Sequence, residues 1–237
     1  MTIDRRRFLE LSGASFTAAF LSACDSFGPR SAKGLLRHAE EKNEGIERFL
    51  LRHDSMDQPR RGATHAGGRF PSYFVSPTMP VWDPAVRGAW VLQVDGAVRK
   101  PRRLTLEQLA ALPRRTQTVN HYCVEGWTAV ASWTGVRVSD LAKVVEPTDD
   151  AQYVDFASFD SGYHESWDIE SAMHPQTLIA YAMDGRWLGT NHGAPARVHS
   201  PVKLGYKCTK YLVRVTFMPM RNGGYWSDQG YEWFAGT

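Results

Sequence analysis

Apolar and polar positions recur with two different periods along the chain. Between Ser31 and Arg52, apolar residues return every three or four positions among charged ones, which predicts an amphipathic helix. Beyond about Phe70 the alternation has a period of two, which is typical of half-buried strands. We expect such strands at residues 90–98, 152–159, 178–183, 195–200 and 211–217.

Capping and turn signals divide the strand-rich part into short elements. A Thr-x-x-Gln capping box at 105–108 predicts the start of a short helix. Ser139 is expected to cap another helix that runs through Val145. Asp184-Gly185 lies between two apolar runs and predicts a hairpin with a type I′ turn. The predicted fold class is α+β: a mixed, strand-rich domain with short helices.

The first residues, MTIDRRRFLELSGASFTAAFLSAC, form a targeting segment. Arg5, Arg6 and Arg7 match the twin-arginine pattern, and the short apolar run that follows has the length of a signal sequence. It ends in a segment that resembles a lipobox at Cys24, although an ordinary signal with an incidental cysteine is the alternative. Residues 1–23 are therefore predicted to be a signal peptide.

This targeting segment also predicts organisation and location. Residues 24–69 would be a lipid-anchored N-terminal helix and linker, and residues 70–237 the main domain. We expect a periplasmic protein held at the inner membrane, which Asp25 after the lipidated cysteine also favours. Twin-arginine export carries folded proteins, which raises the expectation of a cofactor inserted before export. The net charge of +3 is scattered and gives no footprint for nucleic acid.

The chain has three cysteines, and with Cys24 assigned to lipid two remain. In an oxidising compartment Cys123 and Cys208 would form a disulfide on composition alone. His121-x-Cys123 also supplies two possible zinc ligands, although structural zinc sites usually show two close pairs. A Cys–His nucleophile is a third alternative, and the residues alone leave these possibilities open.

Four segments together resemble one family. They are WVLQVDGAVRKPRRLTLEQLAALP (90–113), NHYCVEGWTAVASWTGVRVSDL (120–141), residues 178–217 and GYWSDQGYEWFAG (224–236). Their order and spacing are similar to those of the molybdopterin oxidoreductases of the sulfite oxidase superfamily. The resemblance is strongest to the bacterial periplasmic branch that includes the catalytic subunit of protein-methionine-sulfoxide reductase. It implies a sulfite-oxidase-type molybdopterin-binding domain.

The resemblance implies a molybdenum site around Cys123. In the family a cysteine at this position binds molybdenum, together with two dithiolene sulfurs from one pterin. Tyr163 falls where a tyrosine lines the metal site, so Cys123 and Tyr163 are the predicted catalytic residues. Asp160 falls where an acidic residue accepts hydrogen bonds from the pterin. Cys208 is expected to be a spectator beside the phosphate.

Two further motifs imply the cofactor-binding residues. His192 and Arg197 match a His-Gly-x-Pro-x-Arg segment, in which the histidine meets the pterin and the arginine its phosphate. Lys207 and Lys210 match a Gly-x-Lys/Arg-x-x-Lys phosphate segment. Gly205 would let the backbone approach the phosphate closely. The expected cofactor is molybdenum-molybdopterin, and the chain has no Cys-x-x-Cys-His motif for covalent haem.

Departures from the family pattern bear on the substrate. Sulfite oxidases carry arginine where this chain has Gly126, Trp127 and Thr128, and an anionic substrate needs such a positive pocket. The implied reaction is therefore two-electron oxo transfer with a neutral or zwitterionic small molecule such as a sulfoxide. The alternatives are a sulfite-oxidising dehydrogenase and a non-catalytic binding lipoprotein. In the upstream segment, Ser72 and Tyr73 are the candidate polar pocket residues.

Electrons must then come from a partner. We expect a quinone-linked membrane subunit or a cytochrome, and lipid on Cys24 would raise its effective concentration. The chain ends soon after the core domain, where sulfite oxidases add a dimerisation domain, so a monomer is expected.

Overall fold

The computed structural model describes residues 30–51, 56–59, 70–160 and 162–237. By its contacts the chain divides into two units, Met1–Leu50 and Leu51–Thr237. The described part of the first unit is helix α2 (Arg30–Leu50), which confirms the predicted amphipathic helix. The predicted signal peptide and the lipid site at Cys24 lie outside the described residues. No described helix has the length and apolarity needed to cross a membrane.

The second unit contains two sheets. The first sheet has the strand order β2 (Arg102–Thr105), β1 (Val91–Gly96), β10 (Leu212–Met218), β5 (Tyr153–Ser158) and β6 (His164–Asp168). Strands β1 and β10 run parallel, and the other neighbours run antiparallel. This mixed sheet confirms the predicted α+β class.

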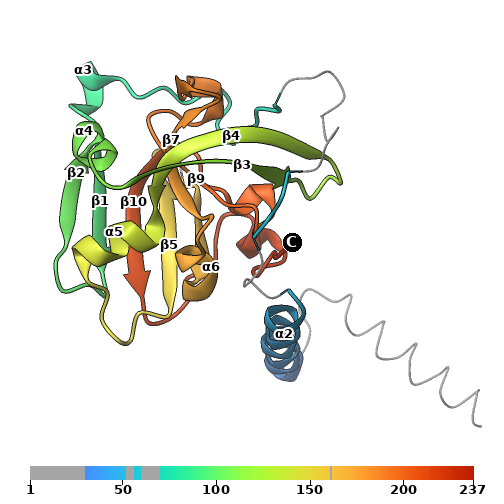
Figure 1. Cartoon of the computed structure of the whole chain (residues 1–237). Coiled ribbons are helices and arrows are strands. Elements are labelled where there is room, and N and C mark those ends of the chain that lie inside the picture. The colour runs from blue at the N-terminus through green and yellow to red at the C-terminus, as the bar shows by residue number, and fades with distance from the viewer. Residues whose placement is uncertain (1–29, 52–55, 60–69, 161) are drawn as a thin grey trace, which may run out of the picture. The chain divides into compact units, whose positions relative to one another are not determined.

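The second sheet is antiparallel and carries the hairpin that matters most for function. Its order is β3 (Arg114–Tyr122), β4 (Thr128–Arg137), β7 (Leu178–Met183) and β8 (Arg186–Trp187), and β9 (Arg197–His199) also pairs with β7. Figure 1 shows β3 and β4 as a long green pair that crosses the view beside β7. Among the described strands, β3 therefore forms an edge of its sheet.

Short helices connect and cover the sheets. They are α3 (Pro84–Arg87), α4 (Leu106–Ala110), α5 (Val138–Val145), α6 (Ile169–Met173) and the 3-10 turns η1 (Thr190–His192), η2 (Gly205–Lys207) and η3 (Ser227–Gln229). The two turns η1 and η2 lie on either side of β9 in the chain, close to the predicted cofactor motifs.

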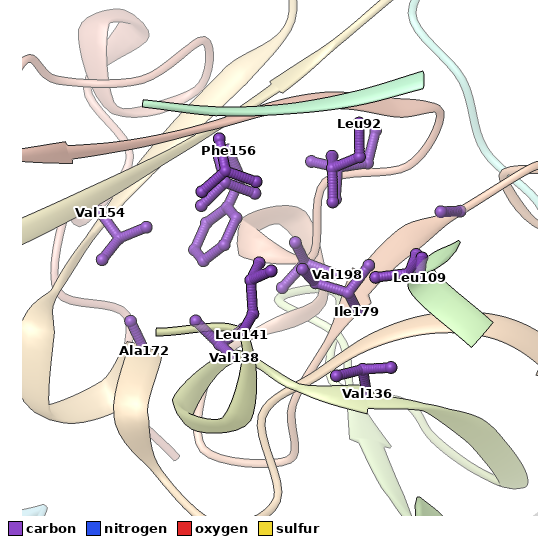
Figure 2. Packing of buried hydrophobic residues seen from close by; sticks show 14 of the residues in the cluster. Leu92, Leu109, Val136, Val138, Leu141, Val154, Phe156, Ala172, Ile179 and Val198 are labelled. Atoms are coloured by element: carbon purple, nitrogen blue, oxygen red, sulfur yellow. The ribbon is translucent and has the colours of Figure 1, made fainter. Parts of the chain in front are cut away.

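The main core lies where both sheets meet the helices. Leu92 of β1 and Phe156 of β5 are fully buried, as are Leu141 of α5, Ile179 of β7 and Val198 of β9. Figure 2 shows these side chains converging from both sheets and from α5. Burying each such side chain stabilises the fold by about 1.5–3 kcal/mol.

The local signals were mostly correct. Thr105 accepts the N–H of Gln108 (3.3 Å), and Gln108 accepts the N–H of Thr105 (2.9 Å), so the capping box is confirmed. Asp184 and Gly185 have φ angles of 49° and 76° between the paired strands β7 and β8, which confirms the hairpin. The prediction for Ser139 was wrong, because α5 begins one residue earlier and has no side-chain cap.

Candidate active site

Cys123 lies in the loop that joins β3 to β4. Its N–H donates to the carbonyl of Trp127 (2.9 Å), and its carbonyl accepts from the N–H of Gly126 (3.0 Å). Gly126 has a φ of 85°, a left-handed conformation that glycine adopts without steric cost. The turn therefore holds the thiol at the tip of the hairpin.

A cavity of about 370 Å³ lies beside this loop. Its walls come from the Cys123 loop and from parts of residues 70–75, 158–163 and 205–211. It has the size of a small-molecule or cofactor site, for which about 300–1,000 Å³ is usual. Six predicted site residues line it, namely Cys123, Asp160, Tyr163, Arg197, Gly205 and Lys210. The other two, His192 and Lys207, do not.

The thiol of Cys123 has the wrong electrostatics for a nucleophile. Burial raises its pKa and the charge of Glu125 raises it further, while backbone N–H groups of Val124 and Glu125 act in the opposite direction. A nucleophilic cysteine needs a lowered pKa. A metal ion, by contrast, removes the proton from a coordinating thiol outright. The raised pKa therefore counts against the Cys–His nucleophile, and the role of metal ligand stays a prediction.

Arg197 places a buried positive charge on the cavity wall. It is 3% exposed. In the described part of the chain its guanidinium donates only to carbonyl oxygens, those of His192 (3.2 Å), Val198 (3.3 Å) and Cys208 (3.3 Å). Burial lowers its pKa. A buried cation with neutral acceptors keeps an uncompensated charge, which an anion would neutralise.

Lys210 and Tyr211 extend this positive wall. Lys210 donates to the carbonyl of Asn191 (2.9 Å), and burial, helped by the charge of Arg197, lowers its pKa to about 7. The buried hydroxyl of Tyr211 has no hydrogen-bond partner among the described residues. Burial and the charge of Asp160 raise the pKa of Tyr211 to about 12, so it stays a donor. The guanidinium of Arg197, the titratable amine of Lys210 and the unused donor of Tyr211 therefore line one cavity.

Lys207 lies behind the wall. It is fully buried, and its ammonium is 2.7 Å from the carboxylate of Glu165 and 3.3 Å from the hydroxyl of Ser227. A buried ion pair is satisfied internally, and breaking it leaves a buried charge unpaired. The phosphate role of Lys207 stays a prediction, and this ion pair would have to open for it.

His192 reaches the cavity through a neighbour. Its ring meets the ring of Phe70 edge-on at 5.7 Å, and Phe70 lines the cavity. Burial, together with the charge of Arg197, lowers its pKa, so the ring is neutral at pH 7. Its buried Nδ1 has no hydrogen-bond partner among the described residues. Since His192 does not line the cavity, its contact with the pterin stays a prediction.

Asp160 and Tyr163 line the cavity with their polar atoms already engaged. The carboxylate of Asp160 accepts the hydroxyl of Ser76 and the N–H of Val75 (3.2 Å). The hydroxyl of Tyr163 donates to the carbonyl of Tyr206, and burial raises its pKa. Both residues therefore also hold the wall together, whatever contact they make with a cofactor.

Gly205 is required by a close approach inside the protein. A Cβ at this position would lie 2.5 Å from Nε2 of His121, on β3. His121 is buried, with a pKa lowered by burial to about 3, and its Nδ1 lies 3.3 Å from Nε2 of His199. The absent side chain thus lets η2 pack against the strand that leads to Cys123.

Another part of the wall is apolar and aromatic. Tyr73, Phe74 and Trp127 line it, and Tyr73 and Trp127 have ring centroids 6.4 Å apart. Glu125 is a polar exception: it accepts the indole N–H of Trp127 (2.9 Å) and lies 3.5 Å from the hydroxyl of Tyr73. Of the two upstream candidates, Tyr73 lines the cavity, whereas Ser72 bonds to the carbonyl of Asn191 instead.

Sequence reasoning missed Glu125 and Tyr211. Glu125 stood in the quoted motif, and its position two residues after a predicted metal ligand was the available signal. Tyr211 follows Lys210 directly, but the sequence pattern assigned it to a strand and gave it no role in the site. Only the fold shows that its hydroxyl is buried at the cavity.

The two cysteines of this unit are free thiols, so the disulfide alternative is not what the structure has. Cys208 also lines the cavity, and its thiol points to the carbonyl of Ser200 (3.7 Å). Within the described residues, no group of three His, Cys, Asp or Glu side chains is placed to hold a metal ion.

This combination of a mixed sheet, a hairpin cysteine and a cationic cavity wall defines a class of protein. The family model of the oxidoreductase molybdopterin-binding domain matches residues 78–226. The chain belongs to this family of oxidoreductases.

Individual relatives make the relationship more specific. The chain is 41% identical over 146 residues to the putative protein-methionine-sulfoxide reductase subunit YedZ1 of Azospira oryzae, covering 62% of this chain and 55% of that protein. It is 31% identical over 153 residues to the protein-methionine-sulfoxide reductase catalytic subunit MsrP of Ralstonia nicotianae, covering 58% and 46%. The chain thus spans about half the length of these curated relatives.

A solved structure supports the fold. The sulfane dehydrogenase SoxCD from Paracoccus pantotrophus aligns with a TM-score of 0.53 at 23% identity. The alignment covers 55% of this chain and 38% of that one. It confirms the sulfite-oxidase-type fold that the sequence predicted.

The residues present fit the cofactor of this family. A phosphate needs buried cations and free donors, and Arg197, Lys210 and Tyr211 supply them. The thiol of Cys123, a side chain of the kind that binds soft metal ions, lines the same cavity.

Proposed function

We propose that this chain is a molybdopterin-dependent oxidoreductase that reduces sulfoxides, with Cys123 as the protein ligand of molybdenum. The observation that carries the proposal is the presence of Cys123, Arg197 and Lys210 on the wall of one cavity. When bound, the cofactor would supply a metal centre able to take an oxygen atom from the substrate and to cycle by two electrons.

The chain's own residues would hold and orient this group. Arg197 and Lys210 would bind the phosphate, and His192 the pterin. Binding an anion beside Lys210 would raise its pKa back above 7, because the opposite charge favours the ammonium form. The thiol of Cys123 would lose its proton on ligation, and the hairpin turn would fix the direction of its sulfur.

The substrate side of the cavity favours a neutral molecule. Tyr73, Phe74 and Trp127 would pack against an apolar group, such as the methyl and methylene groups of methionine sulfoxide. The relatives in the comparison are named as subunits of protein-methionine-sulfoxide reductases, which supports this substrate class. Reduction of a sulfoxide consumes two electrons and two protons and releases a sulfide and water. Glu125 and Tyr73 line the cavity with polar groups that could transfer these protons to the substrate oxygen.

The electron source and the location are parts of the same proposal. A quinone-linked membrane subunit or a cytochrome would deliver the two electrons. Twin-arginine export and lipid on Cys24 would place the enzyme on the periplasmic face of the inner membrane. These features rest on the sequence motifs of the N-terminal segment.

The test begins with the metal. Full-length protein should be produced with its own signal in a host that makes the cofactor, and its molybdenum content measured. We expect stoichiometric molybdenum, reduction of methionine sulfoxide with an artificial electron donor, and no oxidation of sulfite. Correctly folded protein without molybdenum would overturn the proposal, and efficient sulfite oxidation would overturn the substrate assignment.

A matched pair of substitutions tests the ligand. Cys123→Ser should reduce sulfoxide reduction to background. Cys208→Ser removes the other thiol of the same cavity wall and can keep the bond to the carbonyl of Ser200, so most activity should remain. Equal activity in the two variants would contradict the role of Cys123.

A further inference from the structure

A segment upstream of the family domain holds the strand that leads to Cys123. Asp57 lies outside residues 78–226, which the family model matches. Its carboxylate accepts the backbone N–H of Asn120 (2.9 Å), the side-chain amide of Asn120 (2.9 and 3.0 Å) and the hydroxyl of Tyr122 (2.9 Å). The carbonyl of Gln58 accepts the same side-chain amide (2.8 Å).

These contacts close the open edge of β3. This strand has β4 on one side, and the N–H of Asn120 points to the other. An unpaired N–H at a buried edge is costly, and Asn120 is fully buried. Among the described residues, Asp57 thus takes the place of a neighbouring strand at the last residues before the cysteine.

The contacts also lie on the face of β3 opposite to the cavity. Side chains alternate between the two faces of a strand. His121 and Cys123 line the cavity, whereas Asn120 and Tyr122 do not and bind Asp57 instead. Asp57 therefore binds the end of β3 on the face that points away from the cavity, and it does not line the cavity itself.

Asp57 is itself fixed to a different part of the fold. The side chain of Gln176 accepts the N–H of Asp57 (2.7 Å) and donates to its carbonyl (3.1 Å). The carbonyl of Gln176 in turn accepts the side-chain amide of Gln117, further back on β3 (2.6 Å). The segment is thus tied to the body of the domain, which gives it the rigidity needed to position something else.

We infer that Asp57 is a positioning residue for the active-site hairpin. Through Asn120 and Tyr122 it fixes the end of β3, and so the placement of the Cys123 sulfur. The meaning of this placement for catalysis rests on the proposed function. The mechanical part, that Asp57 orders residues 119–127, does not.

The experiment compares two aspartates in the purified full-length protein. Asp57→Asn keeps the shape but removes the charge and one acceptor. Asp95→Asn is the matched control, because Asp95 also accepts several side-chain donors, from Gln93, Arg214 and Thr216, but on the other sheet. Hydrogen–deuterium exchange is measured over residues 119–127, together with the thermal midpoint, kcat and KM.

Asp57→Asn should speed exchange of the Asn120 amide and its neighbours by about tenfold, since a bond to a charged group is lost. It should lower kcat severalfold and leave KM for the sulfoxide unchanged. Asp95→Asn should change neither exchange at 119–127 nor kcat. Unchanged exchange in Asp57→Asn, or equal acceleration in both variants, would overturn the inference.

Two further outcomes are separable. If Asp57→Asn does not fold, Tyr122→Phe removes one donor to the same carboxylate and should give a smaller acceleration confined to the same residues; no acceleration would count against the inference. If the wild type lacks molybdenum, the proposed function fails while the exchange result still decides whether Asp57 orders the hairpin.

Discussion

Two pairs of cations in one stretch of the chain have opposite surroundings. Lys203 and Lys207 are fully buried and meet carboxylates, at 2.8 Å from Asp168 and 2.7 Å from Glu165. These two ion pairs are closed, because each charge is compensated inside the protein.

Arg197 and Lys210 form the other pair and are open. Among the described residues, the hydrogen bonds of Arg197 and Lys210 end on carbonyl oxygens, and both side chains line the cavity. Basic side chains therefore stabilise the fold in the first pair and form a candidate phosphate site in the second pair. What distinguishes them is the partner, which comes from elsewhere in the chain.

The largest expected effect breaks a closed pair. Lys207→Met should lower the free energy of unfolding by about 3–5 kcal/mol, because the carboxylate of Glu165 would remain buried without its counter-charge. Urea unfolding measures this loss. The double variant Lys207→Met with Glu165→Gln should recover part of it. A stable Lys207→Met protein that has lost only its molybdenum would show that Lys207 belongs with the open cations.

The same substitution at an open cation should act on the cofactor instead. Lys210→Met should weaken cofactor retention by about ten- to a hundredfold, because it removes a charged hydrogen bond to phosphate. The free energy of unfolding of cofactor-free protein should change by less than about 1 kcal/mol, since a poorly compensated charge is lost with one hydrogen bond. Molybdenum content and urea unfolding check the two halves, and a large loss of stability would contradict the open assignment.

Acid should weaken a closed pair. The charge of Lys203, its hydrogen bond and those from Ser171 outweigh the opposing effect of burial and lower the pKa of Asp168 to about 2. Its carboxyl binds a proton more weakly when folded than when unfolded. The stability it gives is therefore complete above about pH 4 and is lost as the pH falls towards 2, by about 2–3 kcal/mol.

The check is a pH series of unfolding free energies. The double variant Asp168→Asn with Lys203→Met should show a shallower fall between pH 4 and 2 than the wild type. If the free energy of unfolding fell equally steeply in both proteins, the pair of Asp168 and Lys203 would not account for the loss of stability in acid.

The smallest effect concerns the open wall. Tyr211→Phe removes a hydroxyl that is buried without a partner among the described residues. Cofactor-free protein should unfold at the same free energy or be slightly more stable, by up to about 1 kcal/mol, because a desolvated donor is removed. Cofactor retention should fall modestly. A clear loss of stability without cofactor would show that the hydroxyl has a partner inside the protein.

Local sequence patterns predicted much of the fold. Alternation located β1, β5, β7 and β10, and turn chemistry located the Asp184-Gly185 hairpin. The hairpin of β3 and β4 was missed because the start of β3, Arg114 to Thr116, is exposed and polar. Strand β6 was missed because its sequence, HESWD, buries polar residues whose hydrogen-bond partners lie in other parts of the fold.

The candidate site was predictable as a set of motifs but not as a geometry. The motif resemblance placed Cys123, Arg197 and Lys210 together, and the fold brings them to one cavity. The motif could not show that Lys207 and Lys210 have different surroundings. The carboxylate that pairs with Lys207 belongs to Glu165, 42 positions earlier in the chain. Likewise, Asp57 sits in a segment that reads as a linker, and only its hydrogen bonds to β3 reveal its position.

The most direct test of the account is X-ray absorption at the molybdenum edge, on wild-type protein and on Cys123→Ser. The account predicts one sulfur ligand fewer in the variant, because the pterin sulfurs remain and the thiolate is gone. The same number of sulfur ligands in both proteins would contradict the assignment of Cys123, and with it the central claim about this cavity.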